Sequence, residues 1–253
     1  MASLVEDWWR PLRAAFAFLT RLPGGSATTE EELARSVLFF PVVGLALGLG
    51  CAGVGWLHLV RLAPASIVAG AVVVFLALVT GGLHLDGVAD LFDGLAGGRG
   101  DRERTLRIMR DSRVGAAGAL ALVLVVLLQL AALRELLERR ALLPLVAFPL
   151  VARWAVIPQL AFFRYARAAG LGRVFQGRVA LTPLAAESIL LVTWSLRLGH
   201  GLVVQLAAAL GVSLGLGLWL QHRLGGLTGD IYGATISLCE TATLLVAAVQ
   251  ISP

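Results

Sequence analysis

A succession of apolar runs, each close to the length that crosses a bilayer, constrains this chain most. A transmembrane helix needs about 20 predominantly apolar residues, and seven candidates occur in the 253 residues. They are Val37–Val60, Ser66–Leu83, Val114–Leu133, Leu142–Phe163, Leu184–Leu196, Leu202–Leu220 and Ala234–Ile251. The fifth is short and interrupted by Glu187. The pattern predicts an all-α, polytopic integral membrane helical bundle of about seven transmembrane helices, forming a single domain over residues 1–253.

Composition excludes the main alternatives. Hydrophobic residues make up 58% of the chain and charged residues 15%, whereas soluble domains have about 45–50% and about 25%. A water-soluble enzyme is therefore excluded, and the many large apolar side chains exclude intrinsic disorder. All 21 basic residues are arginine, and they lie between the apolar runs, as in membrane loops. We therefore expect a lipid bilayer around the chain and no nucleic acid partner.

The distribution of arginine predicts the orientation. With a cytoplasmic N-terminus, the cytoplasmic segments hold 15 arginines and the opposite segments 5, with Arg153 inside a span. The positive-inside rule then predicts a multi-pass protein of the cytoplasmic (inner) membrane. Loops 84–113, 164–182 and 221–233 would share the cytoplasmic side, so we expect a cytoplasmic-facing active site. Trp8–Leu19 is too short to span and is expected to form an N-terminal interfacial helix.

The most informative polar stretch is Thr80–Gly94, in which Asp86, Asp90 and Asp93 are spaced i, i+4, i+7. A helix stacks this spacing on one face, and the repulsion between the carboxylates favours a neutralising cation. Mg²⁺ binds through a few carboxylates and then takes substrate phosphate oxygens. The alternative is a solvated acidic helix start, although carboxylates at the end of a span are costly and usually functional. We predict that all three are catalytic residues that bind Mg²⁺.

A second stretch, Arg107–Gly115, precedes the third predicted span. Arg110 and Arg113 supply guanidinium groups that bind phosphate bidentately, although any single arginine here also fits a positive-inside flank. Asp111 either pairs with one of these arginines or joins the metal site. We include all three among the candidate site residues, with Asp111 as both a catalytic residue and a metal ligand.

The last predicted span opens with the Gly-rich stretch Gly225–Gly233, whose glycines allow close approach of a ligand. It contributes Gly229 to substrate binding and Asp230 to catalysis. Glu240 lies about three turns later inside the span, where an unpaired carboxylate is costly, and it is a further candidate for substrate binding. The small residues Gly44 and Gly48 can pack helices within or between chains, so the sequence is compatible with either a monomer or a homo-oligomer.

Three more candidates for substrate binding come from other segments. Gly172 and Phe175 belong to a basic, aromatic and Gly-rich segment, which fits either a phosphorylated ligand or an ordinary membrane edge. His84 precedes Asp86 by two residues. It is placed to contact a phosphate or to orient a carboxylate, or it is a packed residue without a chemical role.

Carboxylates with Mg²⁺, arginines and Gly-rich turns at one membrane face indicate phosphoryl-group chemistry. The metal would neutralise a diphosphate while a carboxylate takes a proton from an attacking hydroxyl. The chain has neither a Walker A motif nor a nucleophile-elbow serine, so transfer onto an alcohol fits better than ATP hydrolysis. A transporter should show an internal repeat, and the His84–Gly94 pattern occurs once.

The chain resembles the cobalamin-5′-phosphate synthase family, also called adenosylcobinamide-GDP ribazoletransferases. The motifs that carry this resemblance are Phe18–Pro23, Phe40–Gly44, Thr80–Gly94, Ile108–Gly115, Gly170–Phe175 and Gly229–Glu240. The resemblance implies the last assembly step of the cobalamin nucleotide loop. In that step Mg²⁺-dependent transfer moves the adenosylcobinamide-phosphate group from adenosylcobinamide-GDP to the hydroxyl of α-ribazole or its 5′-phosphate, and GMP is released.

The chain departs from the family pattern at one residue. The last family motif usually reads Gly-Ala-x-Ile-Glu-x-x-Glu, whereas here Ser237 takes the first acidic position and Glu240 keeps the second. Asp90-x-x-Asp93-Gly94 also looks like half of the motif of CDP-alcohol phosphotransferases, but no aspartate occurs at position 234 to complete the other half. The identity of the general base therefore stays open, and a lipid head-group transferase is the alternative enzyme.

Overall fold

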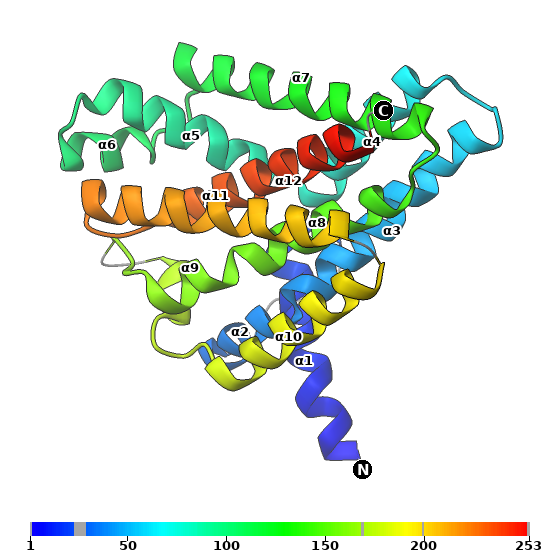
Figure 1. Cartoon of the computed structure of the whole chain (residues 1–253). Helices are drawn as coiled ribbons and strands as arrows, with labels where there is room; N and C mark the ends of the chain where they lie inside the picture. Colours follow the sequence, from blue (N-terminus) through cyan, green and yellow to red (C-terminus); the bar gives the residue numbers. More distant parts are fainter. Residues whose placement is uncertain (1, 23–28, 168–169, 199, 252–253) are drawn as a thin grey trace.

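The computed structural model describes residues 2–22, 29–167, 170–198 and 200–251, and it is helical nearly throughout (Figure 1). The elements are α1 (Ala2–Leu19), α2 (Glu30–Ser36), η1 (Val37–Phe39), α3 (Phe40–Leu59), α4 (Ala65–Thr80), α5 (Leu83–Gly98), α6 (Arg102–Ile108), α7 (Ala116–Glu138), α8 (Leu143–Ala155), α9 (Ile157–Phe162), η2 (Leu171–Phe175), α10 (Leu181–Leu198), α11 (His200–Leu224) and α12 (Gly229–Ile251). Among these residues the β-pairing consists of one isolated bridge, between Tyr165 and Leu227. The predicted all-α class is confirmed. Pro23, the last residue of the first family motif, lies outside the described residues.

Five helical stretches are long and apolar enough to cross a membrane. They are Glu30–Leu59, Ala116–Glu138, Leu143–Phe162, Gly201–Leu224 and Gly229–Gln250. Each overlaps one of the seven predicted spans. The chain therefore has the helices of a multi-pass membrane protein, as its apolar runs indicated.

The second predicted span, Ser66–Leu83, is broken at its end. Gly81 and Gly82 both have left-handed φ angles, 63° and 71°, which glycine adopts at little steric cost. The chain bends there by 89° between α4 and α5. By length and composition the two helices together form one broken span or a re-entrant loop. Helix α5, which carries Asp86, Asp90 and Asp93, therefore runs almost perpendicular to α4.

The fifth predicted span, Leu184–Leu196, lies within α10, which is not among the helices apolar enough to cross a membrane. Polar side chains explain this difference, because Glu187, Ser188 and Ser195 interrupt the apolar sequence. The hydroxyl of Ser188 also accepts a hydrogen bond of 3.1 Å from the indole of Trp154 on α8. By length and composition, the described part of the chain therefore has five candidate membrane-spanning helices, or up to six if the bent pair α4–α5 is one span, against about seven predicted.

The helices α8 and α12 are central to the bundle (Figure 1). Gly44 and Gly48 on α3 allow that helix to approach α8 closely. A Cβ atom added at these positions would lie 2.5 Å and 2.1 Å from the backbone oxygens of Pro149 and Val146. The small-residue face of α3 therefore packs within the chain.

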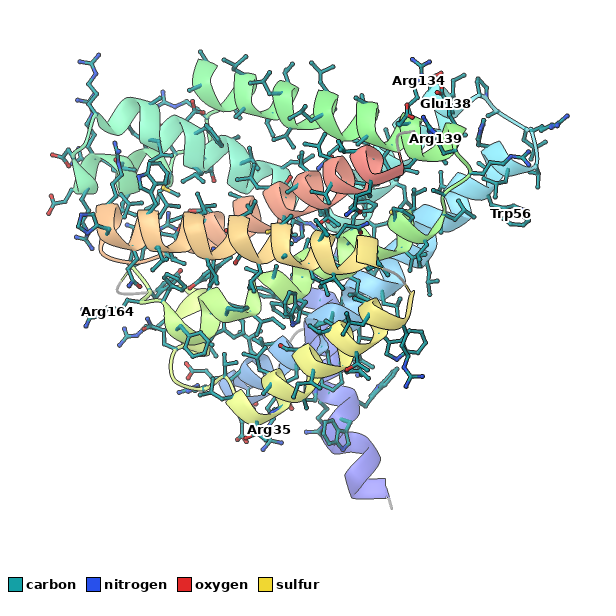
Figure 2. The ribbon with its side chains drawn as sticks, viewed as in Figure 1. Arg35, Trp56, Arg134, Glu138, Arg139 and Arg164 are labelled. Atoms are coloured by element: carbon teal, nitrogen blue, oxygen red, sulfur yellow. The ribbon has the colours of Figure 1, made fainter. Side chains whose placement is uncertain are left out.

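Charged residues gather at opposite ends of the bundle. Figure 2 shows Arg164 at one end, and Arg134, Glu138 and Arg139 together at the other. Arg134 and Glu138 form an exposed ion pair of 2.8 Å, one helical turn apart. Arg164 and the Arg134–Arg139 group thus lie at opposite ends of the bundle.

Candidate functional site

Two glycines allow α5 to cross α12 with almost no space between the backbones. A Cβ atom at Gly87 would lie 2.4 Å from the backbone oxygen of Asp230, and one at Gly233 would lie 3.2 Å from the backbone oxygen of Leu83. No side chain larger than hydrogen fits at Gly87 unless the helices move. The crossing brings the beginning of α12 beside the acidic face of α5.

Asp86, Asp90 and Asp230 meet at this crossing. Asp90 is half-buried and interacts electrostatically with Asp86, Asp230, Asp93 and the guanidinium group of Arg167. Arg167 Nη2 donates a hydrogen bond of 2.6 Å to Asp230 Oδ2, and these two side chains are 13% and 24% exposed. The structure therefore gathers several like charges around Asp90 with one nearby cation.

Asp93 lies on the same helix but has partners of its own. Its Oδ2 and Oδ1 atoms accept hydrogen bonds from the backbone N–H groups of Gly115 (2.6 Å) and Gly118 (2.8 Å). These amides are at the beginning of α7, where a helix leaves its first N–H groups unpaired and favours a negative charge. In this structure Asp93 therefore fixes α7 to α5.

Asp111 pairs with Arg113, which was one of the two alternatives for this residue. The guanidinium group donates to both carboxylate oxygens, with 2.6 Å between Nη2 and Oδ2. These hydrogen bonds, assisted by one from the Arg113 backbone, lower the pKa of the exposed Asp111 carboxyl to about 2. Arg110 and Arg113 are both exposed on the loop before α7.

A cavity of about 410 Å³ lies between the beginnings of α5 and α12 and the segment that follows α9. Its polar side chains are His84, Asp86, Tyr165, Arg167, Asp230 and Tyr232, and the predicted residues Gly172 and Gly229 also line it. Gly172 allows the loop to contact the tyrosine rings, because a Cβ atom there would lie 2.4 Å from Tyr165 Cε2 and 3.1 Å from Tyr232 Cε2.

A second cavity, of about 560 Å³, extends along the break between α4 and α5 and includes Arg21, Gly81 and Gly82. It shares Ala17, Phe18, Leu83 and Asp86 with the first cavity. Asp86 is thus a carboxylate that lines both cavities. This arrangement can bring two ligands to one acidic group.

Comparisons with known proteins identify the family. The family model described as cobalamin-5-phosphate synthase matches residues 11–248. The chain belongs to the cobalamin-5-phosphate synthase family. This confirms the resemblance seen in its motifs and makes the chain a transferase of cobalamin biosynthesis.

Curated relatives support this membership along nearly the whole chain. The adenosylcobinamide-GDP ribazoletransferase of Roseiflexus sp. (strain RS-1) is 40% identical over 245 residues, covering 94% of this chain and 90% of the relative. The protein of the same name from Pseudomonas syringae pv. syringae (strain B728a) is 39% identical, covering 94% and 97%. That from Pseudomonas entomophila (strain L48) is 41% identical, covering 94% and 96%. No solved structure matches the chain.

Two residues predicted to bind substrate lie deeper in the transferase. Glu240 forms a buried ion pair with Arg153 of α8, and the two side chains are 7% and 1% exposed. Both line a cavity of about 20 Å³ together with His84 and Ser237. Phe175 is fully buried and packs edge-on against Phe18, with 5.6 Å between ring centroids. Phe175 therefore supports a cavity-lining residue from behind.

Sequence reasoning missed several residues of this site, and some left a signal. Arg153 lies inside a predicted span, where a charge needs a partner. Glu240 is an opposite charge inside another predicted span, so the ion pair could have been predicted. Arg167 and Tyr165 lie in the basic, aromatic segment after the fourth predicted span. That composition is also typical of a membrane edge, so it did not single them out. Tyr232 and Phe18 lie within family motifs, but no local pattern places them on the cavity wall, because that position depends on tertiary packing.

The donor set fits a Mg²⁺ ion that is completed by substrate. Among the described residues, no three His, Cys, Asp or Glu side chains form a group that could hold a metal alone. Mg²⁺ usually binds through one or two carboxylates and completes its coordination with water and substrate phosphates. Asp86 and Asp90 can supply such hard oxygen ligands, whereas Asp93 and Asp111 are engaged by the α7 amides and Arg113.

Proposed function

We propose that this transferase moves the adenosylcobinamide-phosphate group of adenosylcobinamide-GDP to a hydroxyl of α-ribazole or its 5′-phosphate and releases GMP. The shared name of the relatives supplies the donor and the kind of acceptor. In this chain, the observation that carries the proposal is the position of Asp86. It lines both the 560 Å³ and the 410 Å³ cavity and lies close to Asp90, which also interacts with Asp230.

In the proposed step, the ribazole hydroxyl oxygen forms a bond to the phosphorus atom that carries the cobinamide. The bond from that phosphorus to the bridging oxygen of GMP breaks, and the hydroxyl proton passes to a carboxylate of the acidic face. Bound Mg²⁺ would neutralise the diphosphate and stabilise the leaving group. Arg167 orients Asp230 through its hydrogen bond.

We assign the metal first to Asp86 and Asp90. Asp93 and Asp111 stay in the proposed ligand set only if they exchange their present hydrogen bonds for the ion. Arg110 and Arg113, exposed on the loop before α7, would meet the phosphates of the donor. His84, Gly172 and Gly229 line the 410 Å³ cavity and would contact the acceptor.

We propose the cytoplasmic membrane as the location, with the N-terminus and the site facing the cytoplasm. The excess of arginine in the segments assigned to that side supports this orientation. Arg164 lies at the opposite end of the bundle from Arg134 and Arg139 (Figure 2), as this topology requires.

Product formation by the detergent-purified chain tests the proposed reaction. The protein is given adenosylcobinamide-GDP, α-ribazole or its 5′-phosphate, and Mg²⁺, with and without EDTA. We expect release of GMP coupled to a new corrinoid, and loss of both in EDTA. No product from folded protein would contradict the proposal, and turnover of CDP-activated lipids instead would make the chain a lipid head-group transferase.

A further inference from the structure

The 410 Å³ cavity has a polar, more exposed end and a buried apolar end. Asp86 is exposed, and Arg167 and Asp230 are partly exposed. Its most buried apolar side chains are each at most 3% exposed: Leu19, Phe40, Val156, Leu160 and Ile236. A ligand that fills this cavity must place its polar part near Asp86 and an apolar part among these five side chains.

Two buried polar side chains on the cavity wall have no hydrogen-bond partner among the described residues. They are Tyr232, through its hydroxyl, and His84, through both ring nitrogens; these residues are 7% and 4% exposed. A buried donor without an acceptor is unfavourable, and a ligand atom that accepts from it removes that cost. Such side chains therefore indicate where a polar atom of a ligand would be recognised.

The same wall presents aromatic surface. The rings of Tyr165 and Tyr232 are inclined by only 23°, with centroids 6.5 Å apart. Tyr232 and Ile236 are four residues apart on α12, so they lie on one face of the helix. A planar ring can contact the tyrosine faces while its hydrocarbon edge packs against Ile236.

We infer that this cavity binds the base of the acceptor nucleoside, an apolar bicyclic aromatic of the benzimidazole type, with the ribose directed toward Asp86. The inference rests on the proposed function, because it decides which of the two substrates occupies the cavity. A benzimidazole joined to a sugar has one imine nitrogen that accepts a hydrogen bond and no N–H donor. The Tyr232 hydroxyl supplies the matching donor.

The guanine of the donor fits this cavity poorly. Guanine carries N–H donors on its edge, and the five apolar side chains of the buried end offer them no acceptor, so those donors would be buried unpaired. The cavity is also too small for a corrin macrocycle that carries a nucleotide. The donor therefore approaches Asp86 through the 560 Å³ cavity, which contains Arg21 and the break between α4 and α5.

Two substitutions in the full-length protein test the pocket. Tyr232→Phe removes the unpaired hydroxyl and keeps the ring, so we expect a melting temperature that is not lowered and a KM for α-ribazole about three- to tenfold higher. Ile236→Phe narrows the apolar end and should raise that KM about tenfold or more. The KM for adenosylcobinamide-GDP stays unchanged in both variants. Leu218→Phe on α11, at a side chain that is 62% exposed, is the matched control and changes neither constant.

Direct binding separates this inference from the proposed reaction. Calorimetry on the unmodified protein without donor should show that α-ribazole binds, that free 5,6-dimethylbenzimidazole competes and that guanosine does not. One outcome is that ribazole binds the unmodified protein, binds the two variants more weakly, and no product forms. That outcome would support the assignment of the base to this cavity and contradict the proposed reaction. Displacement of ribazole by guanosine, a raised donor KM, or an unchanged acceptor KM in both variants would overturn the pocket while the reaction could still stand.

Discussion

At the scale of single residues, Asp93 combines the spacing of a metal ligand with the contacts of a helix cap. Both of its carboxylate oxygens accept backbone hydrogen bonds at the beginning of α7. We predict that Asp93→Ala lowers the free energy of unfolding by about 1–3 kcal/mol, seen as a lower melting temperature in detergent. Asp101→Ala, which removes the cap of the short exposed helix α6, should cost less. Loss of Mg²⁺-dependent activity with an unchanged melting temperature would instead make Asp93 a metal ligand only.

Asp111 carries a pH dependence of known sign. Its pKa is lowered to about 2 by Arg113, whereas an unfolded chain titrates aspartate near about 3.9. The stabilising contribution of the Asp111–Arg113 pair is therefore present above about pH 4 and is lost as the pH falls through about 2. Side-chain carbon NMR of the protein in detergent measures this titration, and Arg113→Ala, which keeps the backbone hydrogen bond, should raise the pKa of Asp111 toward its ordinary value. An ordinary pKa in the unmodified protein would mean that the pair does not persist in solution.

At the scale of elements, the crossing of α5 and α12 depends on Gly87. A Cβ atom there would lie 2.4 Å and 2.8 Å from backbone atoms of Asp230 and Ala234, so Gly87→Ala must displace one helix. We expect a loss of about 1–3 kcal/mol in unfolding free energy and a larger proportional loss of turnover. Gly70→Ala on α4 is the matched control, since nothing lies within 4 Å of its added Cβ and alanine favours helix. Equal turnover in the two variants would show that the crossing does not position the site.

The ion pair between Arg153 and Glu240 joins α8 to α12 in the buried centre. Removing one partner leaves a buried charge uncompensated, so Glu240→Ala should cost about 3–5 kcal/mol. The double variant Arg153→Met with Glu240→Leu should recover most of that loss. Thermal unfolding in detergent makes the comparison, and a double variant as unstable as the single one would contradict it.

For the whole molecule, run length and residue spacing predicted the features that depend on neighbouring residues in the sequence. Apolar run length predicted the all-α class and the five helices that are long and apolar enough to cross a membrane. The i, i+4, i+7 spacing placed three aspartates on α5. The break at Gly81 and Gly82 escaped prediction because the predicted span was extended to Leu83, past both glycines. Pairings such as Asp93 with the α7 amides and Arg153 with Glu240 join distant positions, so no spacing rule could supply them. The two cavities that share Asp86 likewise arise from helices far apart in sequence.

The central claim is that the carboxylates at the α5–α12 crossing carry the transfer. The most direct test is GMP release by purified Asp86→Asn and Asp90→Asn variants at saturating Mg²⁺, beside the control Asp101→Asn on the exposed cap of α6. We predict that each site variant loses at least about a hundredfold in rate, with a melting temperature within a few degrees of the unmodified protein, while the control stays fully active. Near-normal GMP release by both site variants would contradict the claim and place the chemistry elsewhere in the chain.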